Sequence, residues 1–96
     1  MLAHTRRKFH DIFAATASAT ASEAIRRIGL LYAIEKQMRG SPPEIRLAAR
    51  QALAIPVMEA LRVWLDQTLQ TLSSKSDMAG AIRYALTRWT ALTRYL

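Results

Sequence analysis

The stretch SPPEIRLAARQALAIPVMEALRVWLDQTLQTL, residues 41–72, is the longest patterned segment of this chain. Ser41 at an N-cap, proline at the first helical position and Glu44 at the third form a capping box, which predicts that a helix begins here. A helix from Pro43 to Leu72 would be roughly 45 Å long at 1.5 Å per residue. Pro56 lacks a backbone N–H and its ring clashes with the carbonyl of Ala52, so we expect a kink or break there.

The apolar residues of this segment change face at Pro56. Before Pro56 one helix face carries Ile45, Ala48, Ala49 and Ala52, and after it another face carries Val57, Leu61, Trp64, Leu65, Thr68 and Leu72. At about 100° per residue the two stripes point in nearly opposite directions. We therefore expect the first half to pair with the preceding helix through Ile45, Ala49 and Ala52, and the later half to pair with the last helix.

Composition places the chain among small, basic, folded domains. Its 96 residues are enough for one domain, residues 1–96, and 51% of them are hydrophobic. Fourteen Lys and Arg against seven acids leave a net charge of +7, which favours polyanionic partners. The absence of cysteine excludes a disulfide framework and thiolate metal sites, and it is consistent with the cytoplasm. The longest uncharged run, residues 12–22, is too short to span a bilayer, so we expect no membrane partner.

Three further helices are predicted around the central one. The first covers Ala3 to Thr16 and is followed by a linker of Ala, Ser and Thr over residues 14–22, since these hydroxyls compete with helix. The second begins at a capping box, Thr20 to Glu23, and stops at Gly40. The last is capped from Ser74 or Ser76 and repeats apolar residues from Met78 to Leu96. The chain is thus predicted to be all-α, with four to five helices in antiparallel hairpins around a long central helix interrupted at Pro56.

The acids favour ion pairs over a metal site. Glu59, Arg62 and Asp66 have the spacing of a surface ion-pair ladder, and Glu35 could pair with Arg39 or Arg46. Two-metal phosphoryl transfer needs two or three converging carboxylates, and no such set is evident. No metal ligand, catalytic residue or cofactor is therefore predicted in this chain.

Two clusters are candidate binding surfaces. Arg6, Arg7 and Lys8, beside His4, form the densest basic cluster and could contact a phosphate backbone, although a solvated helix face explains them equally well. On the last helix, Tyr84, Arg88 and Tyr95 form a second stripe. Alternating aromatic and arginine side chains could stack bases, but an interface to another part of a larger protein is the preferred reading.

The residues Ala3-His4-Thr5-Arg6-Arg7-Lys8-Phe9 are similar to the Cys-Trp-Ala-His-x-Arg-Arg-Lys-Phe motif of bacterial transposases of the insertion-sequence-sixty-six type. Two later blocks, residues 23–35 and 81–92, also resemble that family and occur in its order. Met1-Leu2 stand where the family has Cys-Trp, so we expect the chain to start inside the motif.

The resemblance covers essentially the whole chain but corresponds to a helical middle segment of a protein several times longer. It implies that the two aspartates of a ribonuclease-H-like Asp-Asp-Glu triad lie before this segment and the glutamate after it, with Mg²⁺ as cofactor of the full-length protein. The segment would be a helical insertion, not an enzyme by itself, that assists DNA binding or assembly in DNA transposition. Its partners would be DNA, the remainder of the catalytic domain and, in a homo-oligomer, further copies. A stand-alone nucleic-acid-binding module and a structural or dimerisation domain are the alternatives.

Overall fold

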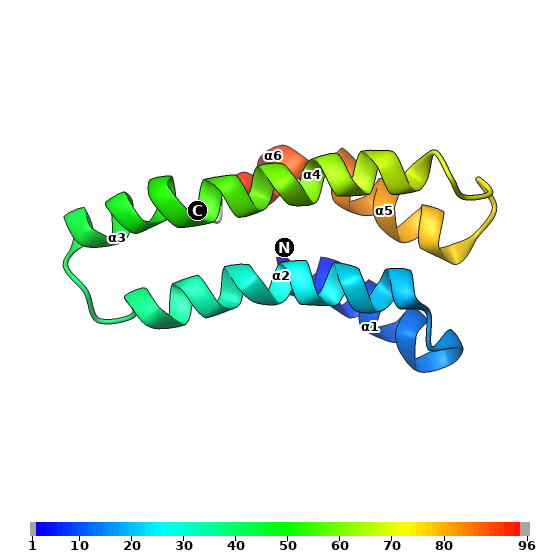
Figure 1. The fold of residues 1–96 in the computed structure, drawn as a ribbon, viewed down its shortest axis with the longest axis horizontal. Helices are drawn as coiled ribbons and strands as arrows, with labels where there is room; N and C mark the ends of the chain where they lie inside the picture. The colour runs from blue at the N-terminus through cyan, green and yellow to red at the C-terminus, as the bar shows by residue number, and fades with distance from the viewer. Residues whose placement is uncertain (1, 95–96) are drawn as a thin grey trace.

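The structure, a computed structural model, describes residues 2–94, and its regular elements are helices throughout that range. They are, in chain order, α1 (Leu2–Thr16), α2 (Ala19–Met38), α3 (Pro43–Ala49), the π-helical segment η1 (Arg50–Ala54), α4 (Ile55–Leu69), α5 (Asp77–Thr87) and α6 (Trp89–Thr93). The predicted all-α class, with helical hairpins around a long central helix, is confirmed (Figure 1).

The central helix is a single rod made of α3, η1 and α4, and it lies antiparallel to α2 (Figure 1). The interruption expected at Pro56 takes the form of π-helix just before it. There the N–H of Ile55 donates to the carbonyl of Arg50, five residues back, rather than four. Because a proline inside an α-helix clashes with the carbonyl four residues earlier, the widened turn is a means of passing Pro56 without ending the helix.

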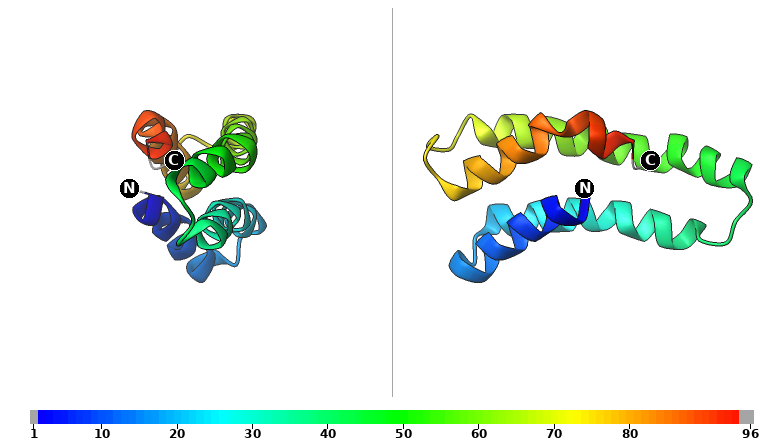
Figure 2. Two further views of the ribbon diagram at one scale, coloured as in Figure 1. Left: turned by 90° about the vertical axis from the view of Figure 1, so that its left-hand side faces the viewer. Right: turned by 180° about the vertical axis from the view of Figure 1, so that it is seen from behind.

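The core lies where four helices meet. α1 packs on α2 and α5, and α4 packs on the same two helices, as the end-on view in Figure 2 illustrates. The largest fully buried side chains come from α1, α2, α4, α5 and α6: Phe9, Ile28, Leu31, Leu65, Ile82 and Leu92. The predicted pairing of the later half of the central helix with the last helix is confirmed, because Leu61 and Leu65 are buried in one cluster with Ile82 and Trp89.

One end of the hairpin extends beyond this core. Seen from behind in Figure 2, α1 and α6 reach only part of the way along α2 and the central helix, which continue as a two-helix arm. We call residues 35–53 the arm. The molecule measures 45 × 22 × 18 Å, and its radius of gyration of 14.0 Å exceeds the ~12.5 Å expected for a compact domain of this length.

The arm alters one prediction about packing. α3 pairs with α2 as expected, but it contains no buried residue. Ile45 is 51% exposed and Ala52 is exposed, so the predicted pairing through these two side chains is wrong; Ala49 is half-buried. The physical reason is that no third helix covers this part of the hairpin, so apolar residues on its flanks lie open.

The N-terminal helices run closer together than predicted. α1 continues to Thr16 and α2 begins at Ala19, which leaves only residues 17 and 18 of the expected linker. The Thr16 hydroxyl donates to the Ile12 carbonyl at 2.8 Å, a bond made inside the helix. Ser18, not Thr20, caps α2 by accepting from the Ala21 N–H at 3.2 Å.

Two predicted ends of the central helix are wrong: the capping box at Ser41 does not form, because Pro42 is the N-cap of α3 and no side-chain hydrogen bond caps it, and α4 ends at Leu69 rather than Leu72. The predicted signals at Gly40 and Ser76 agree with the structure. Gly40 has φ +85°, a conformation that favours glycine, and it turns the chain between α2 and α3. Ser76 caps α5 by accepting from the Ala79 N–H at 3.1 Å. The last helix is divided, because Arg88 leaves helical geometry (φ −105°, ψ 18°) between α5 and α6.

Candidate nucleic-acid interface

The predicted basic cluster lies along the outer side of α1. Leu2, Thr5 and Phe9 face the core at a spacing of three and four residues and are buried. The four candidate DNA-binding residues occupy the remaining positions and are exposed: His4, Arg6, Arg7 and Lys8. The sequence pattern therefore fixes which side of α1 carries positive charge.

Two cations of this cluster lie against aromatic rings on neighbouring helices. The Arg6 guanidinium carbon is 5.2 Å from the ring centre of Tyr32 on α2, and Lys8 Nζ is 4.4 Å from the ring centre of Tyr84 on α5. Such cation–π contacts contribute about 0.5–1 kcal/mol each at exposed sites. Arg7 instead forms an exposed ion pair with Asp11 at 3.4 Å. His10, outside the predicted set, lines a shallow hollow with Arg6 and Arg7.

The contact at Tyr84 joins the two candidate clusters. Arg88 places its guanidinium carbon 3.8 Å from the same ring centre, and its Nη1 donates to the Tyr84 carbonyl at 3.4 Å. Lys8 from α1 and Arg88 from the α5–α6 junction thus gather at one ring, although 80 residues separate them in sequence. Tyr95, the third residue predicted for that stripe, lies outside the described residues. Sequence reasoning missed this cross-helix contact, because no helical spacing links α1 to α5.

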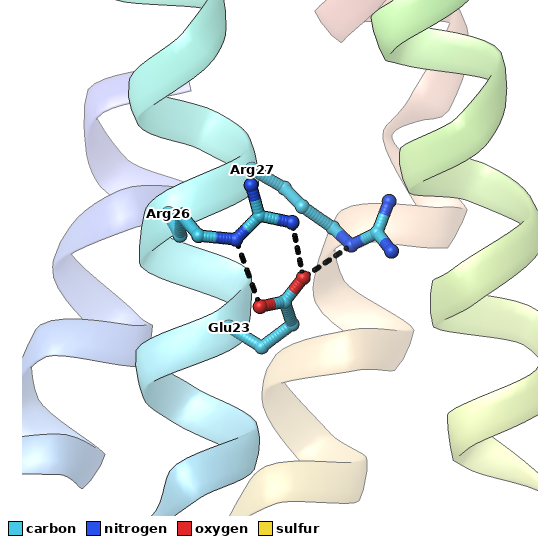
Figure 3. Close-up of polar contacts among 3 residues, drawn as sticks. All are labelled: Glu23, Arg26 and Arg27. Atoms are coloured by element: carbon cyan, nitrogen blue, oxygen red, sulfur yellow. Dashed lines mark hydrogen bonds and ion pairs between the residues drawn. The ribbon is translucent and has the colours of Figure 1, made fainter.

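Two further basic side chains, Arg26 and Arg27, form ion pairs with the carboxylate of Glu23 on α2 (Figure 3). Arg26 donates to both oxygens of Glu23, at 2.9 and 2.6 Å, and Arg27 Nε lies 3.0 Å from Glu23 Oε1. The hydrogen bond from Arg26 lowers the pKa of Glu23, against a smaller opposing effect of burial. Arg27 also lies 5.4 Å from the ring centre of Trp64 on α4. These two arginines are therefore partnered within the fold, and Arg27 links α2 to α4.

Two expected ion-pair groups do not form between residues 2 and 94. Glu35 makes no ion pair with Arg39 or Arg46, and the ladder of Glu59, Arg62 and Asp66 is absent. Arg62 instead lies 5.9 Å from the ring centre of Trp89. The charged residues of both groups are exposed to solvent. An ion pair at an exposed position gains little free energy, because water solvates the separate charges almost as well.

The described residues do not provide a metal centre. Between residues 2 and 94 no three His, Asp or Glu side chains lie close enough together to hold an ion. The Mg²⁺ implied for a full-length transposase therefore does not fit these residues, and no catalytic step is assigned to them. Over the same range, every helix is too short or too polar to cross a bilayer.

Comparison with known proteins supplies the family. The sequence profile of the family described as "Transposase IS66 family" matches residues 2–96. The chain is similar to "Uncharacterized protein y4jD" of Sinorhizobium fredii, with 40% identity over 99% of this chain and 19% of that protein. It is also similar to "Uncharacterized protein y4qI" of the same organism, with 37% identity over 98% of this chain and 17% of that protein. The chain thus spans less than a fifth of the length of these two relatives. No solved structure matches it significantly.

Proposed function

The chain belongs to the IS66 family of transposases, and from this premise we propose that it is a helical insertion that contacts DNA phosphates during transposition and has no catalytic activity alone. Its contact surface is the exposed side of α1, with His4, Arg6, Arg7 and Lys8. Arg88 extends this surface across the Tyr84 ring.

One observation carries the proposal: Lys8 of α1 and Arg88 of the α5–α6 junction, which are distant in sequence, lie against the same aromatic ring. Lys8 and Arg88 lie against one aromatic ring, and Arg6 lies against another, so each cation is held near the surface while it stays exposed. Side chains held in this way lose less conformational entropy when they bind. Contacts to phosphate position a protein on DNA without reading its sequence, and arginine and lysine are suited to them.

The non-catalytic part of the proposal is supported by how the acids are arranged. Asp11 pairs with Arg7, and Glu23 pairs with two arginines, so these carboxylates are bound to cations of the chain itself. By the family resemblance, the triad of carboxylates that cuts and joins DNA belongs to other parts of a full-length transposase.

A charge-matched pair of variants tests the DNA contact. Duplex binding by the 96-residue chain is measured by fluorescence anisotropy at several salt concentrations. The triple variant Arg6→Ala, Arg7→Ala, Lys8→Ala should flatten the dependence of log K on log salt by at most about 2.7, since each phosphate contact contributes roughly 0.9. Random and transposon-end duplexes should lose affinity by similar factors.

The control removes the same charge elsewhere. Lys36, Lys75 and Arg94 are exposed and outside the cluster, so Lys36→Ala, Lys75→Ala, Arg94→Ala should change the slope much less. Circular dichroism verifies that both variants keep their helices. If the two triple variants behave alike, the α1 surface is not the contact surface.

A role in assembly is the second candidate, and exposed apolar side chains favour it. Leu47 and Ile55 are exposed on the central helix, 55% and 39% respectively, and they line a groove whose other side is Trp89 of α6. Apolar surface of this kind is often covered by protein. Sedimentation equilibrium separates the two functions, because a chain that self-associates and ignores duplex DNA acts in assembly.

A further inference from the structure

The arm carries arginines whose guanidinium groups make no polar or aromatic contact within the described part of the fold. Eleven residues of the chain are arginine. The guanidinium groups of seven contact a carboxylate, a carbonyl oxygen or an aromatic ring: Arg6, Arg7, Arg26, Arg27, Arg62, Arg83 and Arg88. Within residues 2–94, the other four make no such contact: Arg39, Arg46, Arg50 and Arg94.

Three of those four line one pocket. It lies between the end of α2 and the start of the central helix, where Arg39, Arg46 and Arg50 come together around a partly enclosed space. Its apolar lining is supplied by Leu31, Ile34, Met38 and Ala54. Gly40, with φ +85°, turns the chain so that Arg39, the residue that follows α2, and Arg46 from α3 line the same pocket from the two sides of the loop.

Like charges so placed repel one another, and an anion between them would remove that repulsion. Glu35 is the single acid in the lining, so the formal charge of the described pocket residues is three positive and one negative, or about +2. The apolar lining strengthens attraction for an anion because it lowers the local dielectric constant. A phosphate group, with a charge of about −1 in a diester and −1.5 to −2 in a monoester, complements this pocket.

We propose that Arg39, Arg46 and Arg50 form a binding site for a phosphate group. Each guanidinium offers five N–H donors in a planar fork that fits two phosphate oxygens, and three such forks exceed what the two oxygens of a carboxylate accept. The pocket already contains the carboxylate of Glu35, which lies within ion-pair distance of no arginine in the described structure. The site is separate from the α1 cluster and does not depend on it.

The probe for this site is inorganic pyrophosphate, added to the 96-residue chain at constant ionic strength. We expect saturable shifts of the amide resonances of Ile34, Arg39 and Gly40 in NMR spectra. Arg46→Ala, Arg50→Ala should raise the dissociation constant at least tenfold, because two charge-assisted contacts are lost. The control Lys75→Ala, Arg94→Ala removes the same charge outside the pocket and should change the constant less than twofold.

A duplex DNA titration distinguishes the two sources of the phosphate. If the group belongs to a DNA backbone, Arg46→Ala, Arg50→Ala also flattens the salt dependence of duplex binding, by up to about 1.8. If it is free phosphate, that dependence is unchanged while the affinity for pyrophosphate falls. Both results support the site, and neither requires that the α1 cluster bind DNA.

Three results would overturn the proposal. The first is the absence of saturable pyrophosphate binding at the pocket. The second is an equal loss of affinity in the pocket variant and in its control, which would indicate attraction to net charge alone. The third is a glutamate-rich peptide that displaces pyrophosphate at comparable concentration, since this would identify a carboxylate site instead.

Discussion

Replacing Phe9 by alanine should destabilise the fold more than any surface change, because this side chain fixes α1 on the core. Phe9 is 0% exposed and lies in the cluster shared by α1, α2, α4 and α5. A buried phenylalanine removes about 150–250 Å² from water, which corresponds to about 4–6 kcal/mol at ~25 cal/mol per Å². Since alanine keeps part of this area buried, we expect a loss of about 3–5 kcal/mol in the free energy of unfolding.

That loss is large for a domain of this size. At about 0.05–0.15 kcal/mol per residue, 96 residues have a total stability of roughly 5–14 kcal/mol. Because each kcal/mol lowers the Tm of such a domain by about 4–8 °C, the variant should melt at least ~12 °C below the wild type. Urea denaturation followed by circular dichroism gives the free energy, and thermal melts give the Tm.

Phe13→Ala provides a matched control one turn later on the same helix. Phe13 is 41% exposed, so the substitution removes less buried area than the one at Phe9. We expect a loss of about 1 kcal/mol or less, because no closed cavity is created and alanine is the better helix former. Equal losses at the two positions would refute the placement of α1.

Three further predictions follow from the helix caps, the Glu23 ion pairs and the acids. Ser76→Ala should cost about 1 kcal/mol by urea denaturation because it removes the cap of α5, whereas Ser74→Ala, which removes no cap, should cost much less. The pKa of Glu23 is lowered in the folded state, so its stabilising effect is present above the ordinary value of 4.5 and is lost as pH falls through the folded value; Glu23→Gln should therefore weaken the fall of Tm with acidification, and an unchanged profile would contradict the pairing with Arg26. With Mg²⁺ or Mn²⁺ and transposon-end DNA, the isolated chain should neither nick nor join strands on a sequencing gel, and cleavage that copurifies with the chain would contradict its non-catalytic role.

The helices were predictable because their signals are local. Ser76, Gly40 and the apolar repeats of α4 and α5 act within a few residues, so sequence alone indicates where those helices begin, end and face. The prediction of a linker over residues 14–22 was wrong, and the reason is also local. Serine and threonine can end a helix or bond within it, and here Thr16 bonds within α1 while Ser18 caps α2.

The candidate site could be predicted only as separate clusters. Each basic or aromatic stripe was visible along its own helix, but the contacts of Lys8 and Arg88 with Tyr84 depend on how α1 packs on α5. Likewise, the exposure of Ile45 depends on where α1 and α6 stop along the hairpin. The pattern of residues 41–72 does not indicate where the neighbouring helices α1 and α6 end. The arm and its arginine pocket were therefore not predicted.

An NMR titration of the ¹⁵N-labelled chain with a short duplex tests the proposed DNA contact most directly, because it locates the contact residue by residue. We expect the α1 surface to respond, with large amide shifts at residues 4–8 and at residues 84–88 around Tyr84 that diminish as salt is raised. Duplex binding that leaves both segments unshifted, with the largest changes instead on the outer face of α4 between Glu59 and Asp66, would contradict it.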